Sequence, residues 1–339
     1  MTDTAASPEP KVKPVTILQA INNAIADAMA EDETVLVLGE DVADPEEGGV
    51  VGVTKGLSTR FGDHRVRSTP ISEQAIIGAA IGASLVGYKP IAEIMLMNFT
   101  TVAMDMIVNH AAKLRYMSGG QTHVPIVIRT MTGAGFSSGG QHSDYLEAWF
   151  AHTAGLKVVA PSNAADAYGL MRSAIEDPDP VLYIESLPSY WTPGEASPAE
   201  HRTPIGKARV AKAGLDVTIV SYSRTLNEAL GAVPALEAAG ISAEIIDLRT
   251  ISPWDQEAVL ASVARTGRLL VAHEAVTPFG VGAEIAAVVS NALFGRLKAP
   301  VVRVGGPFTP VPFSKPLETA FTVDAARIAA AAIQLVKEV

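Results

Sequence analysis

The chain has 339 residues, enough for two domains with separate hydrophobic cores. Its 26 basic and 36 acidic residues give a net charge of −10, and the basic residues are scattered, which argues against a nucleic-acid-binding protein. The lack of cysteine excludes disulfides, thiolate catalysis and iron–sulfur clusters and fits a reducing cytoplasm, where we expect the protein. A hydrophobic fraction of 48% favours subunit interfaces.

Residues 1–14 contain no apolar run and are predicted to be a disordered lead-in rather than a secretory signal. Apolar residues then recur every three or four positions over 16–30, which predicts an amphipathic helix. A strand is expected over 34–38. An acidic, glycine-rich loop and a short helix lead to a long apolar stretch, residues 69–99.

That stretch is predicted to begin with a helix at Glu73, because Pro70 and Ser72 are typical of the residues just before a helix. Nearly every following residue is apolar or small, so the helix should be covered on all sides, within the chain or by another subunit. Gly78 and Gly82 would let another backbone approach closely.

Glu73 is the candidate functional acid of this stretch. A carboxylate flanked by so much apolar sequence should lose water, which raises its pKa. A glutamate in the first turn of a helix more often only complements the helix dipole. The buried strand expected over 90–97 carries Met95 and brings Phe99 to its carboxyl end.

The next segments continue the alternation of helices and strands. A helix is expected over 101–116 and a buried strand over 125–129, followed by a loop with four glycines that ends at His142. A glycine-rich loop after a strand is where an open α/β sheet binds ligands. Further helices and strands up to residue 185 predict a mostly parallel sheet with helices on both faces.

A proline-rich segment, 187–204, interrupts the periodicity and is predicted to be a linker. A second α/β unit follows, with a bend expected at Pro234 in its first helix. The predicted fold class is therefore α/β, with two domains that each hold a mostly parallel sheet flanked by helices. The expected boundaries are a lead-in 1–14, a first domain 15–186, a linker 187–204 and a second domain 205–339. Strands of the second domain are expected over 217–220, 243–246, 269–272 and 301–304, and helices near 225–239, 255–265, 281–293 and 324–337.

The glycine-rich loop also suggests a serine hydrolase. Gly135, Ser137 and Gly139 have the G-x-S-x-G spacing of a nucleophile elbow, and His142 is close in sequence. An elbow needs a helix directly after the serine, whereas more glycine follows here, so this alternative is the weaker one. The dinucleotide motif G-x-G-x-x-G fails at Ser138.

Other motifs are informative by their absence from the sequence. No pair of histidines has a metal-binding spacing, and there is no G-x-x-x-x-G-K-[ST] phosphate loop. Nor is there a G-D-G followed by the asparagine that holds a diphosphate through magnesium, so this chain alone is not expected to bind such a group.

Several long segments, in order, carry a family resemblance. They are TPISE, EIMLMNF, AAKLRYMSGG, GGQHSDYLEAWFAHTAGLKVVAPS, SAIEDPDPVLYIES, VTIVSYS, AEIIDLRTISPWD and VAHEA. Over residues 14–339 the chain resembles the beta subunit of the thiamine-diphosphate-dependent first component of 2-oxo acid dehydrogenase complexes, in the transketolase-like superfamily. This resemblance implies a pyrimidine-binding domain followed by a transketolase carboxyl-terminal-like domain.

The resemblance also implies roles for four residues. Glu73 matches the acid that hydrogen-bonds the aminopyrimidine ring of thiamine diphosphate, and the side chains of Met95 and Phe99 match positions that pack around that ring. On the strand pattern alone, these two residues would be read as core filling. His142 matches a histidine near the thiazolium and the substrate, where it would help transfer an acyl group to a lipoyl group.

Partners follow from the same resemblance. The missing diphosphate motif belongs to an alpha subunit in this family, so the site is expected to form between chains of a two-alpha, two-beta heterotetramer, with magnesium held mainly by the alpha subunit. The second domain is expected to build the dimer and to dock a lipoyl acyltransferase core. A structural potassium ion is implied at positions that match Ile126, Ala174, Ile175, Asp177 and Asp179, mostly through carbonyl oxygens.

The expected activity is that of an oxidoreductase acting on an oxo group with a disulfide, lipoamide, as acceptor, and pyruvate is the first choice of substrate. GGVVGVTKGL and VIRTMTGAGF are somewhat more similar to acetoin dehydrogenase beta chains, which leaves acetoin as the alternative. Branched-chain 2-oxo acids are a third possibility.

Overall fold

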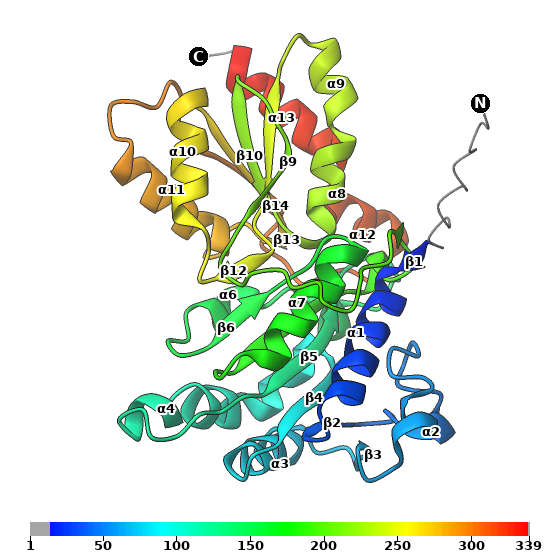
Figure 1. Ribbon diagram of the computed structural model, residues 1–339. Helices are drawn as coiled ribbons and strands as arrows, with labels where there is room; N and C mark the ends of the chain where they lie inside the picture. Colours follow the sequence, from blue (N-terminus) through cyan, green and yellow to red (C-terminus); the bar gives the residue numbers. More distant parts are fainter. Residues whose placement is uncertain (1–13, 338–339) are drawn as a thin grey trace, which may run out of the picture.

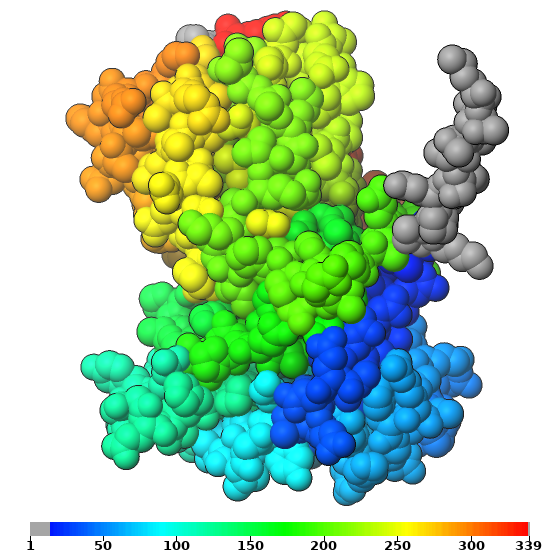
Figure 2. All heavy atoms as spheres, in the orientation of Figure 1, coloured from blue at the N-terminus to red at the C-terminus, as the bar shows by residue number. Residues whose placement is uncertain are grey.

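The computed structural model describes residues 14–337 and shows two α/β domains, one above the other in Figure 1. The space-filling view shows them as two lobes, with residues near 200 packed across the boundary (Figure 2). The predicted two-domain α/β fold is confirmed. The lead-in predicted for residues 1–14 lies outside the described residues, apart from Pro14.

The first domain is built on a seven-stranded sheet with the order β12-β6-β7-β5-β4-β2-β3. All neighbouring pairs are parallel except β12 and β6, which are antiparallel. Strand β12 comes from the second half of the chain and was not predicted. The strands are β2 (Val35–Gly39), β3 (Val66–Ser68), β4 (Lys89–Leu96), β5 (Val127–Thr132), β6 (Lys157–Val159), β7 (Val181–Ser186) and β12 (Thr250–Ser252).

Helices cover this sheet much as the apolar periodicity predicts. The first helix, α1, is capped at Thr16, whose side chain and that of Gln19 bond each other's backbone amides. It packs against α7, which Asn163 caps (Figure 1). The helices are α1 (Ile17–Glu31), α2 (Leu57–Phe61), α3 (Glu73–Leu85), α5 (Gly140–Ser143), α6 (Glu147–Ala151) and α7 (Ala164–Glu176), with a 3₁₀ turn η1 (Asp44–Glu46).

The single helix predicted over 101–116 is wrong. The chain instead forms a 3₁₀ segment η2 (Met97–Ala103), a π-helical segment η3 (Met106–Ala111) and a short helix α4 (Leu114–Met117). The Thr100 and Thr101 hydroxyls donate to the carbonyls three residues earlier, at 2.5 and 2.8 Å, and so compete with regular helix bonding.

Helix α3 begins at Glu73 as predicted, although Ser72 makes no side-chain cap bond. One face of the helix is buried in the chain, and the other, which includes Ala75, Ala79 and Gly82, is exposed. The predicted coverage on all sides is therefore not achieved within the described chain.

The second domain holds a five-stranded sheet with the order β14-β13-β10-β11-β9, parallel except for the edge strand β9. Pro234 lies in the first turn of α9, so the predicted bend is a break between α8 and α9. The strands are β9 (Arg209–Lys212), β10 (Val217–Ser221), β11 (Ala243–Asp247), β13 (Leu269–Val276) and β14 (Val302–Gly306). The helices are α8 (Ser223–Gly231), α9 (Val233–Ala238), α10 (Gln256–Thr266), α11 (Val281–Ala292), α12 (Lys315–Phe321) and α13 (Ala325–Lys337).

Two short elements lie near the junction of the domains. Strand β8 (Pro193–Gly194), after a 3₁₀ turn η4 (Leu187–Ser189), pairs with β1 (Val15–Thr16) at the start of the chain. Helix α12, which was not predicted, lies at the junction of the lobes (Figure 1).

The 23 residues Lys315–Lys337 are apolar enough in composition to cross a membrane, but they form two helices, and α13 packs against α8 and β14.

Candidate active site

The four predicted site residues lie at one edge of the first sheet. Glu73 comes after β3, Met95 lies near the end of β4, Phe99 follows β4, and His142 comes after β5. These strands belong to the parallel run β5-β4-β2-β3, whose carboxyl ends share one edge. That edge is where open α/β sheets bind ligands.

Glu73 is the first residue of α3 and is only 9% exposed. No side chain or backbone amide of the described residues donates a hydrogen bond to its carboxylate. Beside it lies Glu40, which directly follows β2 and whose buried Oε1 has no partner among the described residues. Burial raises the pKa of Glu40, and the negative charge of Glu73 raises it further. Two carboxylates therefore lie together at this edge.

The segment after β4 is joined to the loop that carries His142. Asn98 Nδ2 donates to the Gly140 carbonyl at 2.9 Å and to the Asp144 carboxylate at 3.0 Å, and Asn98 Oδ1 accepts the Asp144 amide at 3.2 Å. Phe99 and His142 meet edge to face, with ring centroids 5.6 Å apart. His142 itself is exposed, so its ring is accessible at the edge.

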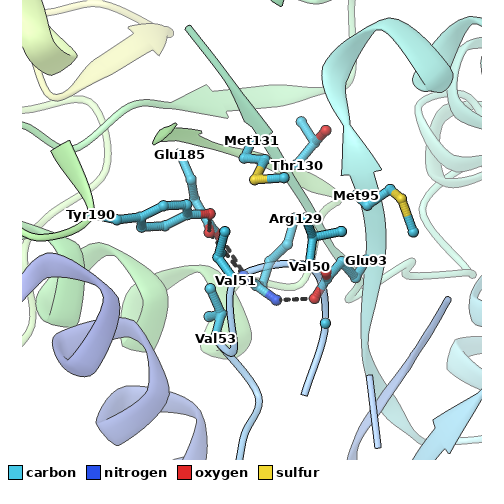
Figure 3. A pocket seen from close by; sticks show the side chains of 11 residues that line it. Val50, Val51, Val53, Glu93, Met95, Arg129, Thr130, Met131, Glu185 and Tyr190 are labelled. Carbon is cyan, nitrogen blue, oxygen red and sulfur yellow. Dashed lines mark hydrogen bonds and ion pairs between the residues drawn. The ribbon is translucent and has the colours of Figure 1, made fainter. Parts of the chain in front are cut away.

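A buried ion network lies below Met95 (Figure 3). Arg129, 2% exposed, donates to Glu93 at 2.5 Å and to both oxygens of Glu185 at 2.6 and 2.8 Å, and the Tyr190 hydroxyl also bonds Glu185. Burial raises the pKa of Glu93, and the Arg129 guanidinium opposes that effect. These residues, with Met95, line a cavity of about 10 Å³, the size of one water molecule. The network ties β4, β5 and β7 together below the edge.

Sequence reasoning missed Glu40 and this ion network. The only local signal was a charged residue at or directly after a buried strand, as at Glu40, Glu93 and Glu185. Their partners lie on strands 36 and 56 residues apart in sequence, so the pairing itself could not be read from the chain.

The structure does not assemble a nucleophile elbow at Ser137. The Ser137 hydroxyl lies 3.4 Å from Glu318 Oε2, and no histidine of the described residues bonds it. No helix begins directly after Ser137; the short α5 starts at Gly140. The hydrolase alternative therefore has no geometric support.

The residues expected around potassium are near one another, and four of the five already have hydrogen-bond partners. Lys157 Nζ bonds both oxygens of Asp177 at 2.6 and 2.7 Å, and Arg115 bonds Asp179 at 2.6 Å. The Ile126 carbonyl accepts the Val181 amide, and the Ala174 carbonyl accepts the Asp177 amide; Ile175 precedes the end of α7. Within residues 14–337 no three His, Cys, Asp or Glu side chains form a metal cluster. The potassium site stays a prediction.

Comparison with known proteins defines the class of fold and site. Residues 13–190 match the family "Transketolase, pyrimidine binding domain", and residues 206–328 match "Transketolase, C-terminal domain". The structure is similar to "Split gene transketolase, inactive beta4 tetramer", with a TM-score of 0.77 and 24% identity over 96% of this chain and 100% of that one. The chain is thus a two-domain protein of the transketolase fold.

Similar sequences narrow the class. The acetoin:2,6-dichlorophenolindophenol oxidoreductase subunit beta of Cupriavidus necator is 47% identical, covering 95% of this chain and 98% of its own. The pyruvate dehydrogenase E1 component subunit beta of Leifsonia xyli is 42% identical, covering 95% of each chain. The 3-methyl-2-oxobutanoate dehydrogenase subunit beta of Mycobacterium tuberculosis is 44% identical, covering 88% of this chain and 85% of its own. The chain belongs to this family of dehydrogenase beta subunits.

Proposed function

We propose that the chain is the beta subunit of a thiamine-diphosphate-dependent 2-oxo acid dehydrogenase. It would take part in decarboxylating pyruvate and in passing the acyl group to the lipoyl group of an acyltransferase core in the cytoplasm. The observation that carries the proposal is the nearly buried Glu73 carboxylate, which accepts no hydrogen bond from the described residues and lies at the ligand-binding edge of a pyrimidine-binding domain.

The residues at this edge fit the aminopyrimidine half of the cofactor. When bound, thiamine diphosphate would supply the carbon nucleophile and the electron sink that decarboxylation of a 2-oxo acid needs. Glu73 would hydrogen-bond a ring nitrogen and share a proton with it, because a poorly solvated carboxylate has few other partners. Met95 and Phe99 would pack around the ring, and His142, exposed beside Phe99, would hold or move a proton during acyl transfer.

The other half of the site is assigned to an alpha subunit. The sequence lacks the motif that binds a diphosphate through magnesium, and relatives of this chain are named as beta subunits. We therefore place the diphosphate and magnesium mainly on the alpha chain of a two-alpha, two-beta heterotetramer. The exposed face of α3, adjacent to Glu73, is free within the described chain for such a contact.

Acetoin cleavage is the second candidate, because the acetoin relative from Cupriavidus necator has the higher identity, 47% against 42% for the Leifsonia pyruvate relative. Both reactions would use the same residues of this chain and the same acceptor. They would differ in the bond broken next to the reacting carbon.

The test is to produce this chain with and without its candidate alpha partner and to assay both for thiamine-diphosphate-dependent oxidation. Pyruvate, acetoin and branched-chain 2-oxo acids would be compared at equal concentration. Activity that needs the partner and the cofactor, with pyruvate fastest, is the expected result. Acetoin as the fastest substrate would select the second candidate. Inactivity of the assembled pair on all three, or phosphonate labelling of Ser137 with ester hydrolysis by the lone chain, would overturn the proposal.

A further inference from the structure

The glycine-rich loop that leads to His142 is held by carboxylates of the other domain. The Ala134 amide donates to Glu274 Oε1 at 2.7 Å. The Gly135 and Ser137 amides both donate to Glu318 Oε1, at 2.7 and 3.0 Å. Free amides in such a loop would form an anion-binding nest, but here two protein carboxylates already occupy that position.

Glu318 makes most of these contacts. It lies on α12 in the second domain, its side chain is fully buried, and Lys315 bonds both its carboxylate, at 3.2 Å, and the Gly135 carbonyl, at 2.8 Å. Burial would raise the pKa of Glu318, but the two loop amides and the Lys315 ammonium hold it below its usual value. An ionised carboxylate accepts stronger hydrogen bonds than a neutral group, so Glu318 is suited to fix the loop.

The same part of the second domain packs on the rest of the loop. Gly139 has a φ of 75°, and a Cβ there would lie 2.5 Å from the Phe313 ring, so only glycine permits this approach. Val311 and Phe321 pack against Ala134. At the far end of the loop, the Asn98 side chain donates to the Gly140 carbonyl before His142 and accepts the Asp144 amide after it. The backbone is thus anchored on both sides of the short segment that presents His142.

We propose that Glu318 is a positioning residue for His142: through the Gly135 and Ser137 amides it sets the course of the loop from which His142 projects. The inference rests on the role proposed for His142. It makes the orientation of a first-domain histidine depend on a second-domain helix, about 180 residues away in sequence.

The first test is hydrogen–deuterium exchange of residues 133–143 in the assembled alpha–beta pair, which needs no turnover. In Glu318→Ala the loop should exchange faster than in the wild type. Glu318→Gln keeps one side-chain oxygen for both amides and should restore most of the protection. Leu317→Ala, at an exposed position of the same helix, is the matched control and should exchange like the wild type. Unchanged protection in Glu318→Ala would overturn the proposal.

The second test is a double-mutant cycle on the rate of lipoamide reduction. Glu318→Ala should lower the rate about 100-fold, as expected when a reacting group is misplaced. The double variant with His142→Ala should be no slower than His142→Ala alone, because both changes remove the same contribution, that of a correctly placed His142. Losses that multiply would mean a merely structural role and would reject the proposal. If Glu318→Ala does not assemble, Glu318→Asp, which shortens the side chain by one methylene, takes its place.

The two proposals can fail separately. A wild-type pair without thiamine-diphosphate-dependent turnover would reject the proposed function, while the exchange experiment would still decide whether Glu318 orders the loop. An active wild-type pair with unchanged exchange in Glu318→Ala would reject only the positioning role.

Discussion

The two domains use the carboxyl ends of their parallel strands in different ways. At the edge of the first sheet, Glu73 accepts no hydrogen bond from the described residues and His142 is exposed. At the edge of the second sheet, Tyr222 follows β10 and donates to Glu147 of the first domain at 2.6 Å, and Glu274 in β13 accepts the Ala134 amide. The first edge, with Glu73 and His142, is left open for a ligand, and we call it the open edge. The second, with Tyr222 and Glu274, is closed against the first domain, and we call it the closed edge.

This difference shows how one arrangement of strands and helices can serve as a site or as a support. Both edges present polar side chains where parallel strands end. The deciding property is whether these groups find partners inside the protein. Unpaired groups such as Glu73 and Glu40 Oε1 remain available to a ligand, whereas Glu274 and Glu318 are used to hold backbone.

The largest effect should come from changing the open edge. Glu73→Gln should lower turnover of the assembled pair about 1,000-fold, within the range for losing a proton-transfer group, with an unchanged melting temperature. Glu33→Gln, at an exposed position, is the control. Steady-state assays and thermal melts check this. A Glu73→Gln enzyme that keeps wild-type turnover would contradict the assigned role.

The ion network below the open edge should matter for stability. Arg129→Met leaves Glu93 and Glu185 buried without their cation and should lower the free energy of unfolding by about 3–5 kcal/mol. Adding Glu93→Gln and Glu185→Gln should recover part of the loss. Urea unfolding measures it, with the exposed Arg296→Met as control. A loss no larger than that of the control would show that the network is not stabilising.

His142→Ala should lower lipoamide reduction about 100-fold, because an acid–base group is removed. Reduction of an artificial dye acceptor by the same variant should fall less, since no acyl group is transferred to lipoamide in that assay. His123→Ala, at an exposed position on another loop, is the control. Normal lipoamide reduction in His142→Ala would reject the role.

Ionisation of Glu147 at the closed edge should make the free energy of unfolding depend on pH. Burial raises the pKa of Glu147 from 4.5 to about 8, although the Tyr222 hydroxyl bond opposes this. The folded chain therefore holds one proton more than the unfolded chain between these values, so ionisation of Glu147 makes stability fall as pH rises through this window. Compared with Glu147→Gln, the wild type should lose up to about 1.4 kcal/mol of unfolding free energy per pH unit there. Parallel profiles for the two proteins would refute this.

The smallest effect concerns potassium, away from both edges. If Ile126, Ala174, Ile175, Asp177 and Asp179 hold the ion, KCl should raise the melting temperature above its value in choline chloride at equal ionic strength. A shift of about 1–2 °C corresponds to about 1 kcal/mol in a chain of 339 residues. Asp177→Asn should remove the increment. Identical melting curves in the two salts would argue that the Lys157–Asp177 pair replaces the ion.

The helices, strands and loops that the sequence predicts correctly are those that depend on local residue pattern. The start of α3 at Glu73, the strand that carries Met95, and the glycine-rich loop before His142 all follow from apolar periodicity and turn residues. The prediction of one helix over 101–116 is wrong because the same apolar periodicity suits 3₁₀, α and π helices. The threonine hydroxyls that bond the backbone in the 3₁₀ segment leave no mark on that periodicity.

The long-range contacts that hold the site in place could not be predicted from local residue pattern. Glu318 and Gly135 are 183 residues apart, and β12 joins a sheet whose other strands precede it by 60 residues or more. Pairings at such distances are set by how the domains pack. Roles for Glu73 and His142 came from family resemblance, because one acid and one histidine do not by spacing alone define a reaction.

The central claim is that this chain supplies half of a thiamine diphosphate site at its open edge. Calorimetric titration of thiamine diphosphate with magnesium into this chain, into its alpha partner and into the assembled pair tests it most directly. The account predicts strong binding only to the pair, and weaker binding when the pair carries Glu73→Gln. Equally tight binding to this chain alone, or to the pair regardless of Glu73, would contradict it.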